Sequence, residues 1–165
     1  MSHDAIVMLK EDHKRIRGLL REFRRPSTTP TRKEMIVERL IELLTVHSHI
    51  ENEVMYPRVR ALVPELEHHV LESAEEHHLF DLLLGELAGM TRADERFMAK
   101  AAVLVGIVRN HLQQEEDVWF PQVRAKLSRP QLREIGLELR AARETAPRRP
   151  SGSDSTGTVL DAVPG

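Results

Sequence analysis

Two stretches of the chain decide its fold: His111–Pro121, which reads HLQQEEDVWFP, and His47–Pro57, which reads HSHIENEVMYP. Each begins with the pattern H-x-x-x-E and ends in an aromatic residue followed by proline. On an α-helix, residues four positions apart lie on nearly the same face, one turn apart. The histidine and the glutamate of each stretch therefore point the same way. An imidazole and a carboxylate stacked like this can serve a metal ion held between helices.

The two stretches belong to an internal repeat with an offset of 64 positions, for example from residue 13 to residue 77. The pairs that share this offset are His13 and His77, His47 and His111, Glu51 and Glu115, Pro57 and Pro121, Ile6 and Val70, Ile16 and Phe80, Leu20 and Leu84, Leu40 and Leu104, Leu43 and Ile107, Leu44 and Val108, and Val54 and Val118. A hairpin of two helices therefore occurs twice, and the two copies can pack around a pseudo-twofold axis. This arrangement predicts an all-α protein, an antiparallel up-down-up-down four-helix bundle.

Apolar residues at steps of three and four indicate five helices. They are expected over residues 4–24, from about 31 through Val54, over 65–87, from about 93 through Val118, and from 128 to about 143. Thr31 and Glu34 form a capping-box pattern for the second helix, and Pro57 is expected to end or kink it. We expect residues 1–127 to form the bundle, 128–145 an accessory helix, and 146–165 a disordered tail rich in Pro, Gly, Ser and Thr.

Composition limits the class of protein. The 165 residues include no cysteine, which excludes a disulfide framework and suits a reducing cytoplasm. The amino terminus lacks the apolar region of a secretory signal, and no apolar run is long enough to span a membrane. The formal net charge is −2 and charges of both signs are mixed along the chain. We therefore expect a cytoplasmic protein without a nucleic-acid or membrane partner.

Six ionisable residues are predicted to face the interior of the bundle: His13, His47, Glu51, His77, His111 and Glu115. Two facing carboxylates in a dry interior would repel each other or take up protons. A pair of metal ions removes this conflict, because imidazole nitrogen and carboxylate oxygen suit iron, manganese or zinc. These residues therefore predict a dinuclear metal centre, with two histidines for each metal and the two carboxylates as bridges.

A lone histidine in the first and third helices and H-x-x-x-E in the second and fourth resemble the hemerythrin family in its bacterial HHE cation-binding form. The resemblance covers about residues 1–127. It implies a non-haem di-iron site bridged by an oxo or hydroxo group and two carboxylates. By position, it assigns His13 and His47 to one iron, His77 and His111 to the other, and the two glutamates to both.

One position departs from the oxygen carriers of that family. They have an additional histidine one turn before the ligand of the third helix, where this chain has Ser73. The helix-four ligand is also a glutamate rather than an aspartate. Both departures argue against reversible oxygen carriage and predict more room for water or a small molecule. Within the wider family, this leaves binding or sensing of O₂, NO or a related ligand, redox catalysis on peroxide or nitric oxide, and iron storage or structural metal binding as hypotheses.

The other polar residues near these motifs have simpler interpretations. His49, His68, His69 and His78 lie off the inward stripe, and His3 precedes the first helix. Glu65–His68 and Glu75–His78 match the E-x-x-H motif of ferritin-type sites, but both occur on one helix, whereas such sites take them from two. Glu53, Glu116 and Asp117 are expected in solvent, with a supporting contact to a metal ligand as the alternative for one of them. Met55 and Trp119 are expected to pack in the core, with a pocket wall beside the metals as the alternative. Tyr56 is expected to be buried and satisfied away from the site, with a hydrogen bond near the site as the alternative.

Overall fold

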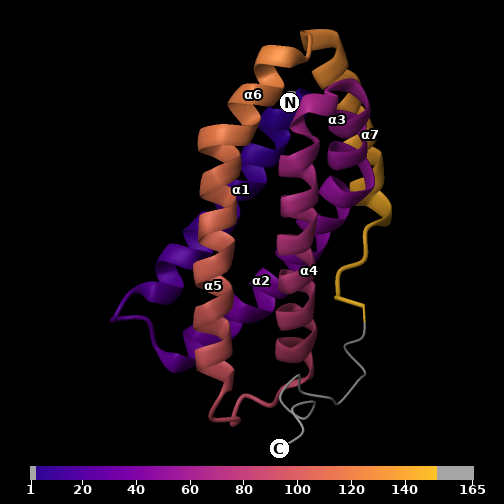
Figure 1. Ribbon diagram of the computed structural model, residues 1–165. Coiled ribbons are helices and arrows are strands. Elements are labelled where there is room, and N and C mark those ends of the chain that lie inside the picture. Colours follow the sequence, from indigo (N-terminus) through magenta and orange to yellow (C-terminus); the bar gives the residue numbers. More distant parts are fainter. Residues whose placement is uncertain (1–2, 152–165) are drawn as a thin grey trace, which may run out of the picture.

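The computed structural model describes residues 3–151, and every regular element in that range is helical (Figure 1). The elements are α1 (Ala5–Arg24), α2 (Pro30–Ile50), the π-helical turn η1 (Glu51–Met55), α3 (Tyr56–Leu62), the 3₁₀ turn η2 (Pro64–Leu66), α4 (Glu67–Gly89), α5 (Phe97–Gln114), the π-helical turn η3 (Glu115–Trp119), α6 (Phe120–Lys126) and α7 (Arg129–Thr145). The predicted all-α class is confirmed.

Helices α1, α2, α4 and α5 form the bundle. The two hairpins pair α1 with α2 and α4 with α5, and they meet where α2 contacts α4 and α1 contacts α5. In Figure 1, α4 and α5 run side by side in front of α1 and α2. Helix α7 packs against α1, α2 and η1. No helix within residues 3–151 is long and apolar enough to cross a membrane.

The helix starts follow local capping chemistry. The backbone N–H of Val7 donates to Asp4 at 3.1 Å, which caps α1. Ser128 and Gln131 form a capping box at α7, as its sequence suggests. The predicted cap of α2 at Thr31 is wrong, because Thr29 caps that helix and Pro30 takes the first helical position. Proline suits that position because its missing N–H would have no partner within the helix.

The second helical segment does not end at Pro57, although such an end was one of the two outcomes predicted for this residue. The chain stays helical past this residue because η1 inserts one wider turn, in which the Tyr56 N–H donates to the Glu51 carbonyl oxygen. Pro57 then lies in the first turn of α3, which tolerates it. The same arrangement precedes Pro121 after η3. The wider turn changes which residues face inward, so Val118 is 37% exposed, contrary to prediction.

Two hydrophobic clusters fill the interior. One contains residues from α1 and α2 together with Phe80 of α4 and Leu104 of α5. The other contains Trp119 and Phe120 beside Ile135 and Leu139 of α7. Along the chain, the inward histidines and glutamates fall between residues of the first cluster and residues of the second.

Gly136 allows α7 to pack closely on the start of the chain. A Cβ atom at this position would lie 1.6 Å from the carbonyl oxygen of His3, so any larger residue would displace one of the two segments. Beyond α7, Ala146–Ser151 has no helix. The rest of the predicted disordered tail 146–165, residues 152–165, lies outside the described residues.

Candidate metal centre

The six residues predicted to bind metal lie together in the middle of the bundle. His13 comes from α1, His47 from α2, His77 from α4 and His111 from α5, while Glu51 and Glu115 begin the two π-helical turns. All six are buried, with at most 2% of each residue exposed. Their potential ligand atoms form two groups: His13, His47, Glu51 and Glu115, and Glu51, His77 and His111.

Each glutamate lies between one histidine of each hairpin. Glu51 Oε2 is 3.3 Å from the Nε2 atoms of both His47 and His77. Glu115 Oε2 is 3.2 Å from His13 Nε2 and 3.5 Å from His111 Nε2. The two carboxylates are therefore placed to serve two neighbouring positions.

Although His13 Nε2 and Glu115 Oε2 form an ion pair at 3.2 Å, several inward atoms make no hydrogen bond of good geometry. They are His13 Nε2, His47 Nε2, Glu51 Oε1 and Glu115 Oε2, and each is inaccessible to solvent. A buried polar atom without a partner costs about 1–3 kcal/mol. Metal coordination would satisfy all four, and nitrogen and carboxylate oxygen are suitable donors for iron, manganese or zinc. The residues present therefore fit a pair of metal ions.

The outer nitrogen of each histidine has its own partner. His13 Nδ1 is 2.9 Å from Glu116 and His77 Nδ1 is 3.0 Å from Asn52. His47 Nδ1 is 3.4 Å from Asp12, and His111 Nδ1 contacts Glu76. An acceptor at Nδ1 leaves Nε2 free to face a metal and fixes the ring orientation. Glu116 is half-buried and contacts a predicted ligand, which matches the alternative given for it and not the solvated position.

These outer contacts repeat the 64-residue offset, from Asp12 to Glu76 and from Asn52 to Glu116. In every case the acceptor and the histidine come from different helices. These four acceptors were not predicted, because only residues expected to face inward were compared across the 64-residue offset. The same offset applied to the neighbouring polar residues includes all four, but it also pairs Glu53 with Asp117, which are both exposed.

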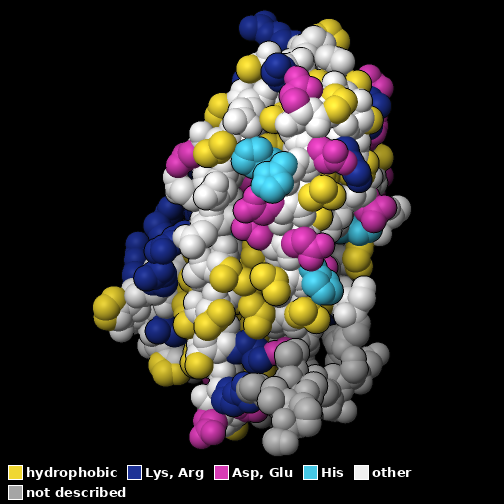
Figure 2. Space-filling view, in the orientation of Figure 1, with side chains coloured by type: hydrophobic (Ala, Val, Ile, Leu, Met, Phe, Trp, Pro, Cys, Tyr) yellow, Lys and Arg dark blue, Asp and Glu magenta, His cyan; other side chains and the backbone are white. Residues whose placement is uncertain are grey.

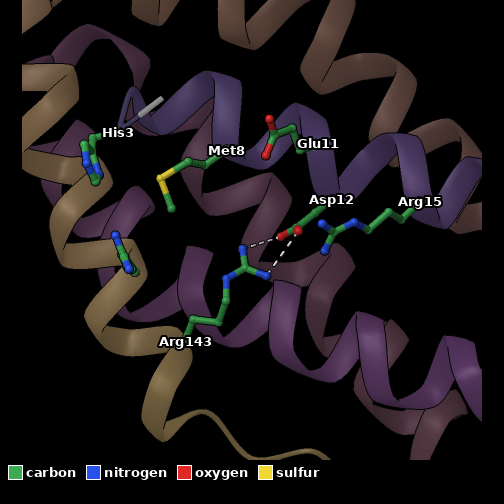
Figure 3. Close-up of a pocket in the computed structure, with 7 residues that line it drawn as sticks. His3, Met8, Glu11, Asp12, Arg15 and Arg143 are labelled. Atoms are coloured by element: carbon green, nitrogen blue, oxygen red, sulfur yellow. Dashed lines mark hydrogen bonds and ion pairs between the residues drawn. The ribbon is translucent and has the colours of Figure 1, made fainter. Parts of the chain in front are cut away.

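Arginines support the outer contacts of one half of the site. Arg143 of α7 binds both oxygens of Asp12, at 3.1 and 2.6 Å, as Figure 3 shows. Burial raises the Asp12 pKa, but the hydrogen bonds from His47 and Arg143 outweigh it and lower the pKa to about 2. Arg17 lies 3.5 Å from Glu116. Asp12 and Glu116 thus each lie between an arginine and a histidine.

The hydroxyl of Tyr56 lies at the centre of the cluster and not away from it, which matches the alternative given for this residue. It donates to Glu115 Oε1 at 3.0 Å and is 3.3 Å from Glu51 Oε2 and 3.2 Å from His77 Nε2. Ser73 lies close enough to this hydroxyl to influence its pKa. Burial, with the charges of Glu115 and Glu51, raises the Tyr56 pKa well above its usual value, so the group is a hydrogen-bond donor at neutral pH.

Without metal, the two central carboxylates titrate differently. Burial and repulsion by Glu115 raise the pKa of Glu51 well above its usual value. Burial also acts on Glu115, but the neighbouring His111 and His13 lower its pKa overall. Burial and the charge of His111 lower the pKa of His77 well below its usual value. The metal-free pair thus tends to hold one proton on Glu51, which a metal ion would displace.

The remaining candidates lie elsewhere. Glu53, Asp117 and His78 are exposed. The His68 side chain is 90% exposed and Glu65 pairs with Lys126, so the E-x-x-H motifs do not join the cluster. His3, His49 and His69 are half-buried outside both ligand groups.

One protein-family model matches the part of the chain that contains both the bundle and the inward residues. The model of the Hemerythrin HHE cation binding domain matches residues 4–123, which include all six inward residues. The chain belongs to the hemerythrin HHE cation-binding family. The expected resemblance is confirmed, and this hemerythrin-like domain carries a His/Glu cluster that could bind metal.

A solved structure and a curated relative resemble this hemerythrin-like chain. The structure is a Hemerythrin HHE cation binding domain-containing protein from Mycobacterium kansasii, with a TM-score of 0.67, 23% identity and 86% of each chain covered. It supports the fold. The relative is a DNA nickase from Nostoc sp., 28% identical over 150 residues. These residues are 91% of this chain but 42% of the relative, so the chain spans less than half of that protein's length.

Proposed function

We propose that the protein holds two iron ions within the bundle and uses this centre to bind or sense O₂, NO or a related small ligand. The observation that carries the proposal is the set of four buried imidazoles and two buried carboxylates, whose inward atoms include four without a hydrogen-bond partner. His13 and His47 would hold one ion, His77 and His111 the other, and Glu51 and Glu115 would bridge them.

The outer partners prepare this site for metal. Asp12, Glu116, Asn52 and Glu76 accept from Nδ1 of the four histidines, so the Nε2 lone pairs face inward. The rings are therefore oriented before a metal arrives, which reduces the conformational cost of binding. Bound iron would supply Lewis acidity and one-electron redox chemistry.

The surroundings restrict what can enter. Phe120 stacks on His13 with ring centroids 5.4 Å apart, and Trp119 packs edge-on against Tyr56. These rings limit water around the six polar residues, which strengthens electrostatic interactions there. The Tyr56 hydroxyl provides a hydrogen-bond donor beside both carboxylates. Such a donor can stabilise a small ligand that gains negative charge.

The proposal is tested by mixing the reduced, iron-loaded protein rapidly with O₂, NO and hydrogen peroxide and following the optical spectrum. A stable adduct that dissociates reversibly supports ligand binding or sensing. Continuous turnover of peroxide or NO would instead identify a redox enzyme. Retention of iron without a reaction towards any of the three would indicate storage or a structural role and would overturn the proposal.

A further inference from the structure

A groove of about 490 Å³ lies between the C-terminal half of α1 and the C-terminal half of α5. Five arginines line it, and no acidic residue does: Arg17, Arg21, Arg24, Arg25 and Arg109. Figure 2 shows a band of Lys and Arg side chains along the left edge of the molecule, over α1. The net charge of −2 therefore conceals a strongly cationic surface.

Most of these arginines are available to a partner. Arg21, Arg24, Arg25 and Arg109 are exposed, and among residues 3–151 none of them donates a side-chain hydrogen bond to a carboxylate. The charge of Arg25 does act on Glu22, whose pKa is lowered mainly by its hydrogen bond with Arg32 and also by Arg25. Glu22, the acidic residue between them on α1, binds Arg32 at 2.6 and 3.0 Å.

Helix electrostatics accounts for only part of this cluster. Arg21 and Arg24 lie in the last turn of α1, where a positive charge favours the helix dipole. Arg109 lies within α5 and Arg17 two turns from the end of α1, so neither is explained in this way. Like charges gathered on one surface repel each other, and an anionic partner relieves that repulsion.

The arrangement suits a chain of phosphates. Arg17 and Arg21 lie four residues apart on α1, which places their Cα atoms about 6 Å apart on one face of the helix, and Arg25 follows as its C-cap in an extended conformation. The planar guanidinium group binds phosphate oxygens in pairs. Helices that lie on membranes also need apolar side chains that can insert into lipid. Here none of the exposed large hydrophobic residues lines the groove, and Leu20 is only 2% exposed.

We propose that this groove binds the phosphate backbone of a nucleic acid, without selecting a sequence. This proposal departs from the prediction of no nucleic-acid partner, which was based on the net charge of the whole chain and not on the local clustering of the arginines. The proposal does not depend on the metal centre, although Arg17 connects the two regions through its contact with Glu116.

Binding is tested with the full chain and fluorescein-labelled single-stranded and duplex DNA of about 20 nucleotides, by fluorescence anisotropy at several salt concentrations. We expect micromolar dissociation constants at low salt, with the logarithm of affinity falling against the logarithm of salt with a slope of about −3. The double variant Arg21→Gln/Arg25→Gln should bind about tenfold or more weakly, with a slope shallower by about 2.

The double variant Arg129→Gln/Arg133→Gln is the matched control, because it removes the same charge from exposed positions on α7. It should bind like the wild type. Equal weakening of both variants would overturn the proposal, as would wild-type protein that fails to bind nucleic acid at low salt. Binding to phosphatidylserine vesicles in preference to DNA would also overturn it, in favour of a lipid surface. Circular dichroism of each variant excludes unfolding as the cause.

Discussion

The two helical hairpins carry the same inward residues but different supporting contacts. His13, His47 and Glu51 of the first hairpin correspond to His77, His111 and Glu115 of the second. Their outer contacts diverge. The first two histidines face carboxylates that arginines hold, whereas the last two face an amide and a half-exposed carboxylate. The requirements of metal binding explain why the inward residues are the same in both hairpins. The packing of each hairpin explains why the outer contacts differ.

The aromatic residues show the same divergence. Tyr56 corresponds to Phe120, and each ring lies against the histidine of the opposite hairpin, Tyr56 against His77 and Phe120 against His13. Only Tyr56 carries a hydroxyl, which contacts both central carboxylates. The two proposed metal positions are therefore not chemically equivalent, despite their duplicated ligands.

The largest effect is expected from Glu115→Ala, which affects both hairpins at once. Glu115 contacts a histidine from each, so its loss should reduce the metal content from about two ions per chain to nearly none. Elemental analysis of the purified protein measures this directly. Asp117→Ala is the control, since Asp117 is exposed two positions away. Equal losses from both variants would show that the inward position of Glu115 is irrelevant.

The next effect concerns the arginine that supports only the first hairpin. Arg143→Ala frees Asp12 from α7, so His47 loses its fixed orientation. We expect one of the two metal ions to bind about tenfold more weakly, the lower end of the range for outer contacts. Competition with a chelator measures the two affinities.

Arg140→Ala is the matched control, because Arg140 is exposed on the same helix and forms no ion pair within residues 3–151. If Arg143→Ala releases both metals equally, or behaves like Arg140→Ala, the two positions do not differ in the way that their outer contacts indicate. Arg143→Lys should restore part of the affinity, because lysine keeps the charge but lacks the paired hydrogen bonds.

Tyr56→Phe makes the two hairpins more alike. It keeps the aromatic ring and removes the donor to Glu115, so we expect the free energy of unfolding of the metal-free protein to fall by about 1–3 kcal/mol. The metal-loaded protein should keep its ions but show a shifted optical spectrum. Chemical denaturation and absorption spectroscopy test the two parts. An unchanged spectrum would mean that the hydroxyl does not influence the centre.

The smallest effect is a change in how stability depends on pH. The folded, metal-free protein raises the Glu51 pKa above 4.5, so this residue stabilises the fold fully below pH 4.5 and progressively less as pH rises through its folded pKa. The variant Glu51→Gln mimics the protonated form and removes this dependence. Its melting temperature should therefore exceed that of the wild type by more at about pH 8 than at about pH 5. A difference that shrinks with rising pH would contradict the assignment.

The inward residues could be predicted because the repeat constrains them twice. One offset aligned four histidines, two glutamates and the core, so chance alignment of any one residue mattered little. The structure brings these six residues together. The inward position predicted for Val118 is wrong because it requires 3.6 residues per turn. The turn η3 is wider, so the residues after Glu115 are rotated relative to that expectation.

Other parts of the site depend on contacts that a repeat does not reveal. Arg143 lies outside the duplicated segment, and its contact with Asp12 depends on how α7 packs against α1. Tyr56 was predicted to be buried and satisfied away from the site, and its counterpart Phe120 has no polar group that would have indicated a contact with the cluster. Such contacts follow from tertiary packing and require the structure.

The most direct test of the central claim is the metal content of the aerobically purified, full-length protein, measured together with its near-ultraviolet absorption. The arrangement of His13, His47, Glu51, His77, His111 and Glu115 predicts about two iron ions per chain and charge-transfer bands between the metal and its ligands. Helical protein that remains free of metal after incubation with ferrous iron would contradict the account.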